Sequence, residues 1–496
     1  MKTAAFFLAC AASSLSSAVD AAGPGFLLPP DAWTEASAGV VPARDGNGRS
    51  SVRVFSGVEP VESLCAELGA PLPGKYLRIE AEFSVREPGE GACDVWRLRL
   101  SQPGRALDPR CQVPVVTQVA AHRTVVLEPF YEAEPSQPLA IRLERENGDP
   151  RNTFRQPVEL HSLRLVPVDP PGENIVVSAT PGYNAWPFLQ QLGDKLVCAY
   201  SRGTKHYFGE LKRGVYARTS SDGGKSWSEE TEAVNTEIWA ESVIGKGLDP
   251  SGAALFWVRN AGQEWHHDLY RTTDGVHFER IARIKPEPMP MQITDIIHVP
   301  GTGLMSLWFA GTYREDQTHS WGTLVSRDGG KSWEQTVIES GLGKQEWPTE
   351  PTAVYLGDGR IFAIARVEGA AEDSTRAFFQ LESADSGKTW TRSRTNITDV
   401  LESTPSLLLD RGRLYLYYYQ RMAGQLKCRS AEVEAVSGKP LSWQAPRIVA
   451  LGSKAWHHAG NVNALLLGNG DHGLAFYSGD EAGTTIVLKL LSGAFF

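Results

Sequence analysis

The stretch that decides the fold is SSDGGKSW, residues 220–227, which returns as SRDGGKSW at residues 326–333. Ser and Asp side chains can bond the backbone amides of a tight turn, Gly can take the positive φ, and the Trp can pack beneath it. Weaker copies are TTDGVHF from Thr272 and SADSGKTW from Ser383. We therefore expect the four aspartates to shape turns rather than to catalyse.

The turns recur with a nearly fixed period. Their aspartates fall at positions 222, 274, 328 and 385, so the steps are 52, 54 and 57 residues, and a worn copy, SGKPLSW, ends at Trp443. A period near fifty with several strands per repeat is typical of a β-propeller. Five marked repeats and a closing one predict an all-β fold with a six-bladed propeller over residues 173–496. The run ENIVVSA, residues 173–179, is expected to close the ring by joining the last blade.

The part of the chain before the repeats has a different pattern. Short alternating runs such as YLRIEAEFSV, VWRLRLS and ELHSLRLVPV are separated by Pro and Gly clusters between residues 26 and 168. This pattern predicts an antiparallel β-sandwich. The adjacent prolines of DPPGEN, residues 169–174, cannot sustain a strand ladder and indicate a linker between the two domains.

The first 22 residues, MKTAAFFLACAASSLSSAVDAA, combine a lysine, a short apolar run and small residues. This is the pattern of a signal peptide, so the protein is expected to be secreted, periplasmic or attached to the cell surface. No later stretch is apolar for the 18 residues that a membrane helix needs, so no membrane span is expected. The formal charge of −9 and the lack of a basic run argue against nucleic acid as a partner.

The six cysteines give no sign of a metal site, because neither CxxC nor HExxH occurs. We expect no metal and no cofactor. Cys198 and Cys428 lie in apolar runs and are expected to be buried. One disulfide among Cys65, Cys93 and Cys111 would suit an exported domain.

The repeated turn resembles the Asp box, S-x-D-x-G-x-x-W, of the sialidase (neuraminidase) superfamily, and the resemblance covers Glu173 to Phe496. A more specific match is TEPTAVYLGDGRIFAIAR, residues 349–366, in which Glu350 and Arg366 are sixteen positions apart. The resemblance implies that Glu350 is the active-site carboxylate and that Arg366 is one of three arginines that grip the sialic acid carboxylate. A guanidinium suits this task because it binds a carboxylate through two parallel hydrogen bonds and stays charged.

Other arginines recur near the end of the second strand of each repeat. In a propeller this position comes round the axis once per blade, so several of them can converge on one central cavity. Alternatively, they are strand-end ion-pair partners. The candidates for substrate binding are Arg202, Arg314 and Arg421.

The chain also departs from the superfamily pattern. The F-R-I-P arginine is replaced at Asn184-Ala185-Trp186-Pro187, ESTPSLLL from Glu402 holds no arginine, and WHHAGN, residues 456–461, stands where the family has its nucleophilic tyrosine. Either a displaced tyrosine, such as Tyr477 or one of Tyr417 to Tyr419, attacks the sugar, or water attacks directly with inversion.

An inverting glycosidase needs a general acid and a general base set further apart than in a retaining one. Histidine is suited to such proton transfer near neutral pH. The candidates near the starts of repeats are Glu350, Asp295, His457 and His458. A further candidate is His206, in the loop RGTKHYFGE, which also holds Glu210. The further substrate-binding candidates are Trp186, Trp347, Asn184 and Asn461. The two tryptophans would supply apolar walls for sugar faces.

The sequence thus favours an exo-α-sialidase that hydrolyses terminal sialic acid from sialylated glycans or glycoproteins, with the N-terminal domain as a carbohydrate-binding or spacer module. Two alternatives stay open. One is a propeller glycoside hydrolase or lyase that acts on uronic acid glycans, which also carry a carboxylate. The other is a lectin that binds glycans without cutting them.

Overall fold

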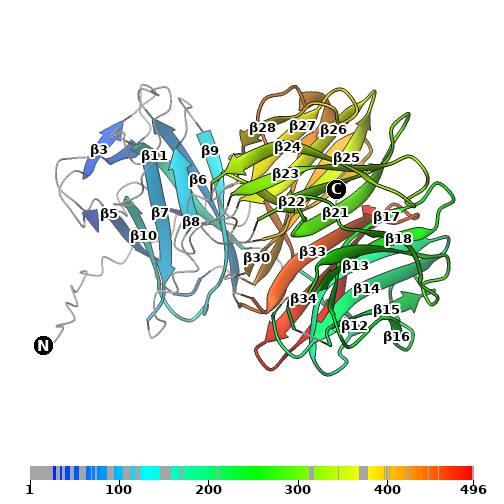
Figure 1. Cartoon of the computed structure of the whole chain (residues 1–496). Coiled ribbons are helices and arrows are strands. Elements are labelled where there is room, and N and C mark those ends of the chain that lie inside the picture. The colour runs from blue at the N-terminus through cyan, green and yellow to red at the C-terminus, as the bar shows by residue number, and fades with distance from the viewer. Residues whose placement is uncertain are drawn as a thin grey trace, which may run out of the picture. The chain divides into compact units, whose positions relative to one another are not determined.

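Figure 1 shows the computed structural model of the chain. The structure describes residues 171–493 except 208, 211, 312–317, 344–345, 368–377, 396, 398–399, 401–402, 422–423, 445 and 456. Towards the N-terminus it describes strands β1 to β11, without most of their side chains, and residues 70–72, 75, 102–103 and 133–138. The contacts divide the chain into two compact units, Met1–Pro170 and Pro171–Phe496. The predicted signal peptide and the cysteines Cys93 and Cys111 lie outside the described residues.

The N-terminal unit contains two antiparallel sheets. One has the order β3 (Val40–Arg44), β4 (Ser50–Val54), β11 (Val158–Pro167), β6 (Tyr76–Val85), β9 (Arg123–Glu132), with β1 (Phe26–Leu28) beside β11. The other has the order β2 (Thr34–Glu35), β5 (Ser63–Leu68), β10 (Leu139–Arg145), β7 (Asp94–Ser101), β8 (Val113–Thr117). Both sheets bury apolar side chains, such as Leu77 and Leu165 of the first and Leu100 and Ile141 of the second.

The C-terminal unit is built from antiparallel sheets that resemble propeller blades. Four of them have four strands in sequential order. They are β17 (Ala240–Leu248) to β20 (Glu279–Ile284) through β18 (Ala254–Ala261) and β19 (His266–Thr272); β21 (Gln292–Val299) to β24 (Glu334–Leu342) through β22 (Gly303–Ala310) and β23 (His319–Ser326); β25 (Pro348–Gly357) to β28 (Thr391–Arg394) through β26 (Arg360–Val367) and β27 (Phe379–Ser383); and β29 (Ser406–Asp410) to β32 (Arg447–Leu451) through β30 (Arg413–Gln420) and β31 (Gln425–Glu432).

The remaining strands of this unit come from the beginning and the end of its sequence and form one sheet. An eight-stranded sheet contains β13 (Tyr183–Leu192), β14 (Lys195–Gly203), β15 (Gly214–Ser220) and β16 (Thr231–Val234) together with β33 (Ala459–Leu466), β34 (His472–Asp480), β35 (Gly483–Leu491) and β12 (Ile175–Ser178). Strand β12 pairs antiparallel with β35. The expected strand at residues 173–179 is therefore confirmed as the segment that joins the end of the chain.

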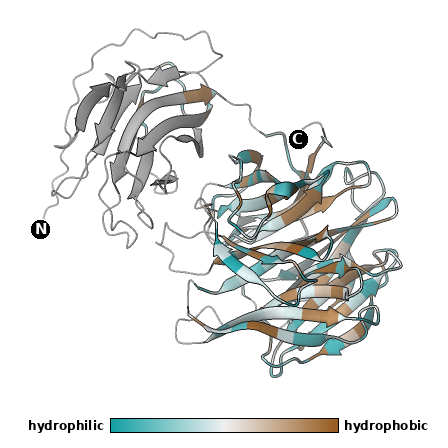
Figure 2. Ribbon diagram, turned by 90° about the horizontal axis from the view of Figure 1, so that it is seen from above, coloured by the Kyte–Doolittle hydropathy of each residue, from teal (hydrophilic) through white to brown (hydrophobic). Residues whose placement is uncertain are grey.

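The core of the unit lies between neighbouring sheets. Within its described residues, each apolar cluster draws side chains from two successive sets of strands, for example Trp257 of β18 with Trp308 of β22, and Tyr417 of β30 with Phe476 of β34. The second strands of the sheets are buried on both faces, whereas the fourth strand β24 is largely exposed. Continuous apolar runs such as GLMSLWFA follow from this two-sided packing. Figure 2 shows the apolar residues along these strands and hydrophilic ones in many of the loops.

The Asp-box turns connect third and fourth strands, and their hydrogen bonds confirm the expected geometry. In the first turn Ser220 Oγ donates to Asp222 Oδ1 at 2.8 Å, and Asp222 Oδ1 accepts from the Ser226 amide at 2.9 Å. Gly224 has φ of 92°, and the Trp227 indole donates to the Gly224 carbonyl at 3.1 Å. The turns at Asp328 and Asp385 repeat these contacts. Their identical bonding accounts for the repeated sequence.

Cys198 and Cys428 are buried, as expected, and both are free thiols. Among the described residues there is no helix long and apolar enough to cross a membrane.

Candidate active site

Three strands that line a shared pocket are interrupted by bulges. Register shifts occur between Ala185 and Phe188 in β13, between Thr349 and Thr352 in β25, and between Gly460 and Asn463 in β33. Bulges of this kind insert unpaired residues and redirect their side chains. Three of the inserted residues, Trp186, Glu350 and Asn461, have φ of 54°, 48° and 45°. Backbone strain at non-glycine residues is common at functional sites, and here it coincides with the pocket wall.

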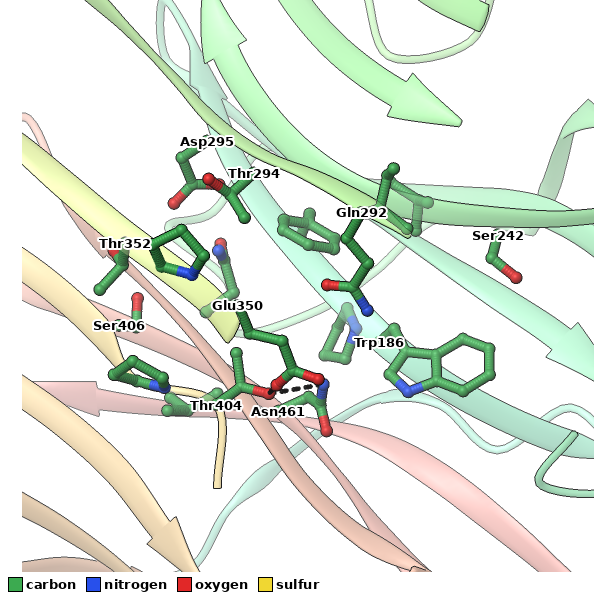
Figure 3. Close-up of a pocket in the computed structure, with 18 residues that line it drawn as sticks. Trp186, Ser242, Gln292, Thr294, Asp295, Glu350, Thr352, Thr404, Ser406 and Asn461 are labelled. Atoms are coloured by element: carbon green, nitrogen blue, oxygen red, sulfur yellow. Dashed lines mark hydrogen bonds between the residues drawn. The ribbon is translucent and has the colours of Figure 1, made fainter. Parts of the chain in front are cut away.

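The pocket takes its walls from six first strands or the residues just before them. Figure 3 shows Glu350, Thr404 and Asn461 pointing toward one another, with Asp295 and Thr294 on a separate part of the wall. The lining residues are Trp186, Pro187, Phe188, Ser242, Val243, Ile244, Gln292, Thr294, Asp295, Glu350, Pro351, Thr352, Thr404, Pro405, Ser406, Asn461, Val462 and Asn463.

Glu350 is the best-connected acid of this pocket. Its Oε1 accepts a hydrogen bond from Nη1 of Arg366 at 3.1 Å, and both side chains are buried. Its Oε2 accepts a short hydrogen bond from the hydroxyl of Thr404. The sixteen-residue spacing therefore brings Glu350 and Arg366 into direct contact, because the hairpin between β25 and β26 pairs Thr349 with Arg366.

A second arginine joins the same network from the next sheet. The Nη2 of Arg421 donates to Asn461 Oδ1 at 3.0 Å, and Asn461 Nδ2 donates to Thr404 Oγ1 at 2.9 Å. Arg366 is the last residue but one of β26, and Arg421 directly follows β30; these are the second strands of their sheets. Two of the arginines that recur at this position thus meet around Glu350.

The three candidate histidines gather around the phenol of Tyr183. Its oxygen lies 3.1 Å from Nδ1 of His206, 3.2 Å from Nδ1 of His458 and 2.6 Å from the carbonyl oxygen of His457. The rings of His206 and His457 stack with centroids 5.1 Å apart. Trp186 of the pocket wall touches the ring of His206, with centroids 5.6 Å apart, so the cluster borders the pocket.

Burial, together with the positive charge of Arg421, lowers the pKa of His206 to about 3. The imidazole of His206 is therefore neutral at neutral pH.

Tyr477 contacts the histidine cluster. It is buried, and its hydroxyl donates to the carbonyl of His457 at 2.9 Å. Burial raises the pKa of Tyr477, Arg421 lowers it, and Glu350 raises it again. These effects place the phenol within electrostatic range of Glu350 and Arg421.

Asp295 holds a different position in the pocket. Its Oδ1 accepts from the amide of Lys246 at 3.3 Å, and the Nζ of Lys246 donates to carbonyls of Leu189 and Ala464 at 2.7 and 2.9 Å. Burial raises the pKa of the Asp295 carboxyl, and Lys246 opposes this rise. Lys246 thus links its own strand, β17, to Asp295 of β21 and to the backbone of β13 and β33.

The loop that carries His206 is fixed by Arg213, which sequence reasoning missed. The buried guanidinium of Arg213 bonds the carbonyls of Lys205 and Tyr207, pairs with Glu210 at 3.1 Å, and lies over the ring of Trp186. Glu210 itself accepts from the Thr204 amide at 2.8 Å. Glu210 thus clamps the loop, and only its closeness to Arg213 in sequence could have indicated this.

Several expected site residues lie elsewhere. Arg202 pairs with Glu230 and lies over the ring of Tyr216. Asn184 bonds the carbonyls of Thr180 and Thr484, both at 2.8 Å, and so helps to join the chain ends. Trp347 is buried in an apolar cluster and stacks on His319. None of these three lines the pocket. Arg314 lies outside the described residues.

The described residues include no group of three or more His, Cys, Asp or Glu side chains that could hold a metal ion.

Comparison with known proteins adds family and fold. Residues 248–453 match the family model described as a BNR repeat-like domain. A protein of unknown function from Dyadobacter fermentans is 16% identical, with a TM-score of 0.54, over 65% of this chain and 98% of that one. The Hadza microbial sialidase Hz136 is 11% identical over 88% of this chain and 97% of its own, with a TM-score of 0.49. The NanB sialidase from Streptococcus pneumoniae is 12% identical over 87% and 98%, with a TM-score of 0.48. A search of the curated proteins found no match. The chain therefore contains a BNR repeat-like domain and shares its propeller-like fold with the Dyadobacter protein.

Proposed function

We propose that the protein is an exo-α-sialidase that hydrolyses terminal sialic acid from glycans or glycoproteins, at the pocket around Glu350. In this proposal residues 173–496 form a six-bladed propeller, residues 26–168 form a sandwich that binds carbohydrate or acts as a spacer, and the signal peptide directs export to the periplasm, the cell surface or the medium. Sialylated glycans are its partners.

The observation that carries the proposal is the single hydrogen-bonded chain from Arg366 through Glu350, Thr404 and Asn461 to Arg421. A guanidinium can bind a planar carboxylate through two parallel hydrogen bonds. Sialic acid presents such a carboxylate beside the bond to be cleaved. The two arginines would orient the sugar, and Glu350 would stand next to the reacting carbon.

The burial of the tyrosines supports direct attack by water. Tyr417, Tyr418, Tyr419 and Tyr477 are all fully buried, and each hydroxyl of Tyr417, Tyr419 and Tyr477 already contacts a protein group. A displaced tyrosine nucleophile would have to leave these positions. Direct attack by water with inversion needs no such movement, and it requires one acid and one base. Glu350 and the cluster of His206, His457 and His458 are our candidates for these groups.

The proposal is tested by proton NMR of the full-length protein with α2,3- and α2,6-linked sialyllactose, observing free sialic acid before it mutarotates. Early β anomer supports hydrolysis with inversion. Early α anomer would show retention and would exclude direct attack by water. If neither substrate is cleaved, the same measurement with uronic acid oligosaccharides distinguishes the second enzyme, and binding without turnover indicates a lectin.

A further inference from the structure

Tyr183 occupies a position whose hydrogen bonding can be counted. It lies in β13 and is buried, and its one oxygen contacts the carbonyl of His457 and the Nδ1 atoms of His206 and His458. A phenol has one proton to donate and can accept hydrogen bonds at its lone pairs. The three contacts therefore cannot all be donated by Tyr183.

The carbonyl contact decides where the phenol proton lies. The Tyr183 and His457 oxygens are 2.6 Å apart, which is a normal O–H···O distance and requires a hydrogen between them. A carbonyl has no proton, so Tyr183 must donate. The same carbonyl accepts from Tyr477 at 2.9 Å, so both of its lone pairs are engaged.

The remaining contacts then fix the histidines. With its proton committed, the Tyr183 oxygen can only accept at 3.1 and 3.2 Å from the two Nδ1 atoms. A neutral imidazole carries one proton, on either Nδ1 or Nε2. If Nδ1 carried no proton, its lone pair would face a lone pair of the phenol oxygen and no hydrogen bond could form. Each Nδ1 must therefore carry the proton.

We propose that Tyr183 is a positioning residue that holds the imidazoles of His206 and His458 in the tautomer with the proton on Nδ1, which leaves the lone pair on Nε2. This inference rests on the proposed function for its role, because an unprotonated Nε2 beside the pocket can accept a hydrogen bond from the attacking water and orient it. His458 is three residues from Asn461 of the pocket wall, and His206 touches Trp186. In general, the hydrogen bond that one ring nitrogen of a histidine makes decides which of the two nitrogens carries the proton.

The test is ¹⁵N NMR of the histidine side chains in the full-length protein, because the two nitrogens have distinct shifts in each tautomer. Signals are assigned with His206→Gln and His458→Gln. We expect both residues to show protonated Nδ1 and unprotonated Nε2 above their titration range. Protonated Nε2 at both residues would overturn the proposal, and the tautomers themselves are read from the wild-type protein, the two variants serving only to assign the signals.

A second measurement uses Tyr183→Phe, with Tyr200→Phe as a matched control. Tyr200 is also a buried phenol of the same sheet, but it donates to Glu230 away from the histidines. Tyr183→Phe should shift the two histidines toward the Nε2-protonated form and lower kcat about 10 to 100-fold with little change in KM, whereas Tyr200→Phe should change neither. Unchanged tautomers in Tyr183→Phe would refute the positioning role. Failure of the proposed function is distinct, since sialyllactose would then stay intact while the tautomers are as expected.

Discussion

The Asp-box turns and the pocket-lining bulges differ in how they use repetition. The turns at Asp222, Asp328 and Asp385 repeat the same side-chain bonds. At the pocket, by contrast, equivalent bulges carry Trp186, Glu350 and Asn461, which share a positive φ but differ in chemistry. Positions with one structural task repeat, whereas positions that face a common cavity diverge because each wall has a separate contact to make.

The sharpest test of this contrast is loss of the pocket carboxylate. Glu350→Gln should lower kcat/KM for sialyllactose about a thousandfold, because the amide keeps the shape but cannot carry the charge or exchange the proton. The matched control is Glu230→Gln, which removes an acid paired with Arg202 outside the pocket. Equal losses in both variants would contradict a special role for Glu350.

Replacement of Arg366 should give the next largest effect on kcat/KM. Arg366→Lys keeps the positive charge but loses the two-pronged geometry, so kcat/KM should fall about 10 to 100-fold. Steady-state kinetics of Arg202→Lys provide the comparison, since Arg202 is held by Glu230 and Tyr216. If Arg202→Lys is the more damaging change to catalysis, the substrate carboxylate is bound elsewhere.

An outer turn should affect stability rather than activity. Asp328→Ala removes an acceptor for the Ser332 amide and hydroxyl and for Lys331, and should destabilise the protein by about 1–2 kcal/mol. Thermal and denaturant unfolding measure this, with the exposed Lys331→Ala as the control in the same turn. Activity of the folded Asp328→Ala protein should be unchanged, and a large loss there would break the contrast between turn and pocket.

The pH dependence of stability tests both regions, and it has the same sign in each, since the turn and the pocket should both lose stability as the pH falls. The hydrogen bonds of Ser332 hold the pKa of Asp328 at about 2, so its stabilisation is present above pH 4 and is lost as the pH falls toward 2. The pKa of His206 is lowered to about 3, so the unfolded chain binds a proton below about pH 6.5 that the folded protein refuses. The free energy of unfolding should fall as the pH decreases from about 6.5 to about 3, and His206→Gln should reduce this slope. An unaltered slope in urea unfolding series would show that His206 is protonated in the fold.

Short local sequence patterns predicted much of the fold. The Asp boxes need only neighbouring residues to form, so their turns were correctly predicted, and the run at residues 173–179 is confirmed as β12 on β35. The contact of Glu350 with Arg366 follows from one hairpin and was within reach of the sequence. Trp347 shows the limit, because an aromatic residue at the start of a strand can line a cavity or fill a core, and here it stacks on His319 in the core.

The sequence by itself determined the all-β class and the repeated turns and singled out Glu350 and Arg366, because these depend on residues close together in the chain. Only the tertiary structure decided which side chains meet across sheets. Arg421 reaches Asn461, Arg213 fixes the His206 loop, and Tyr183 joins His206 to His458, a residue about 250 positions away. Such contacts depend on the register and bulges of strands from opposite ends of the chain, and neither is encoded in a single local pattern.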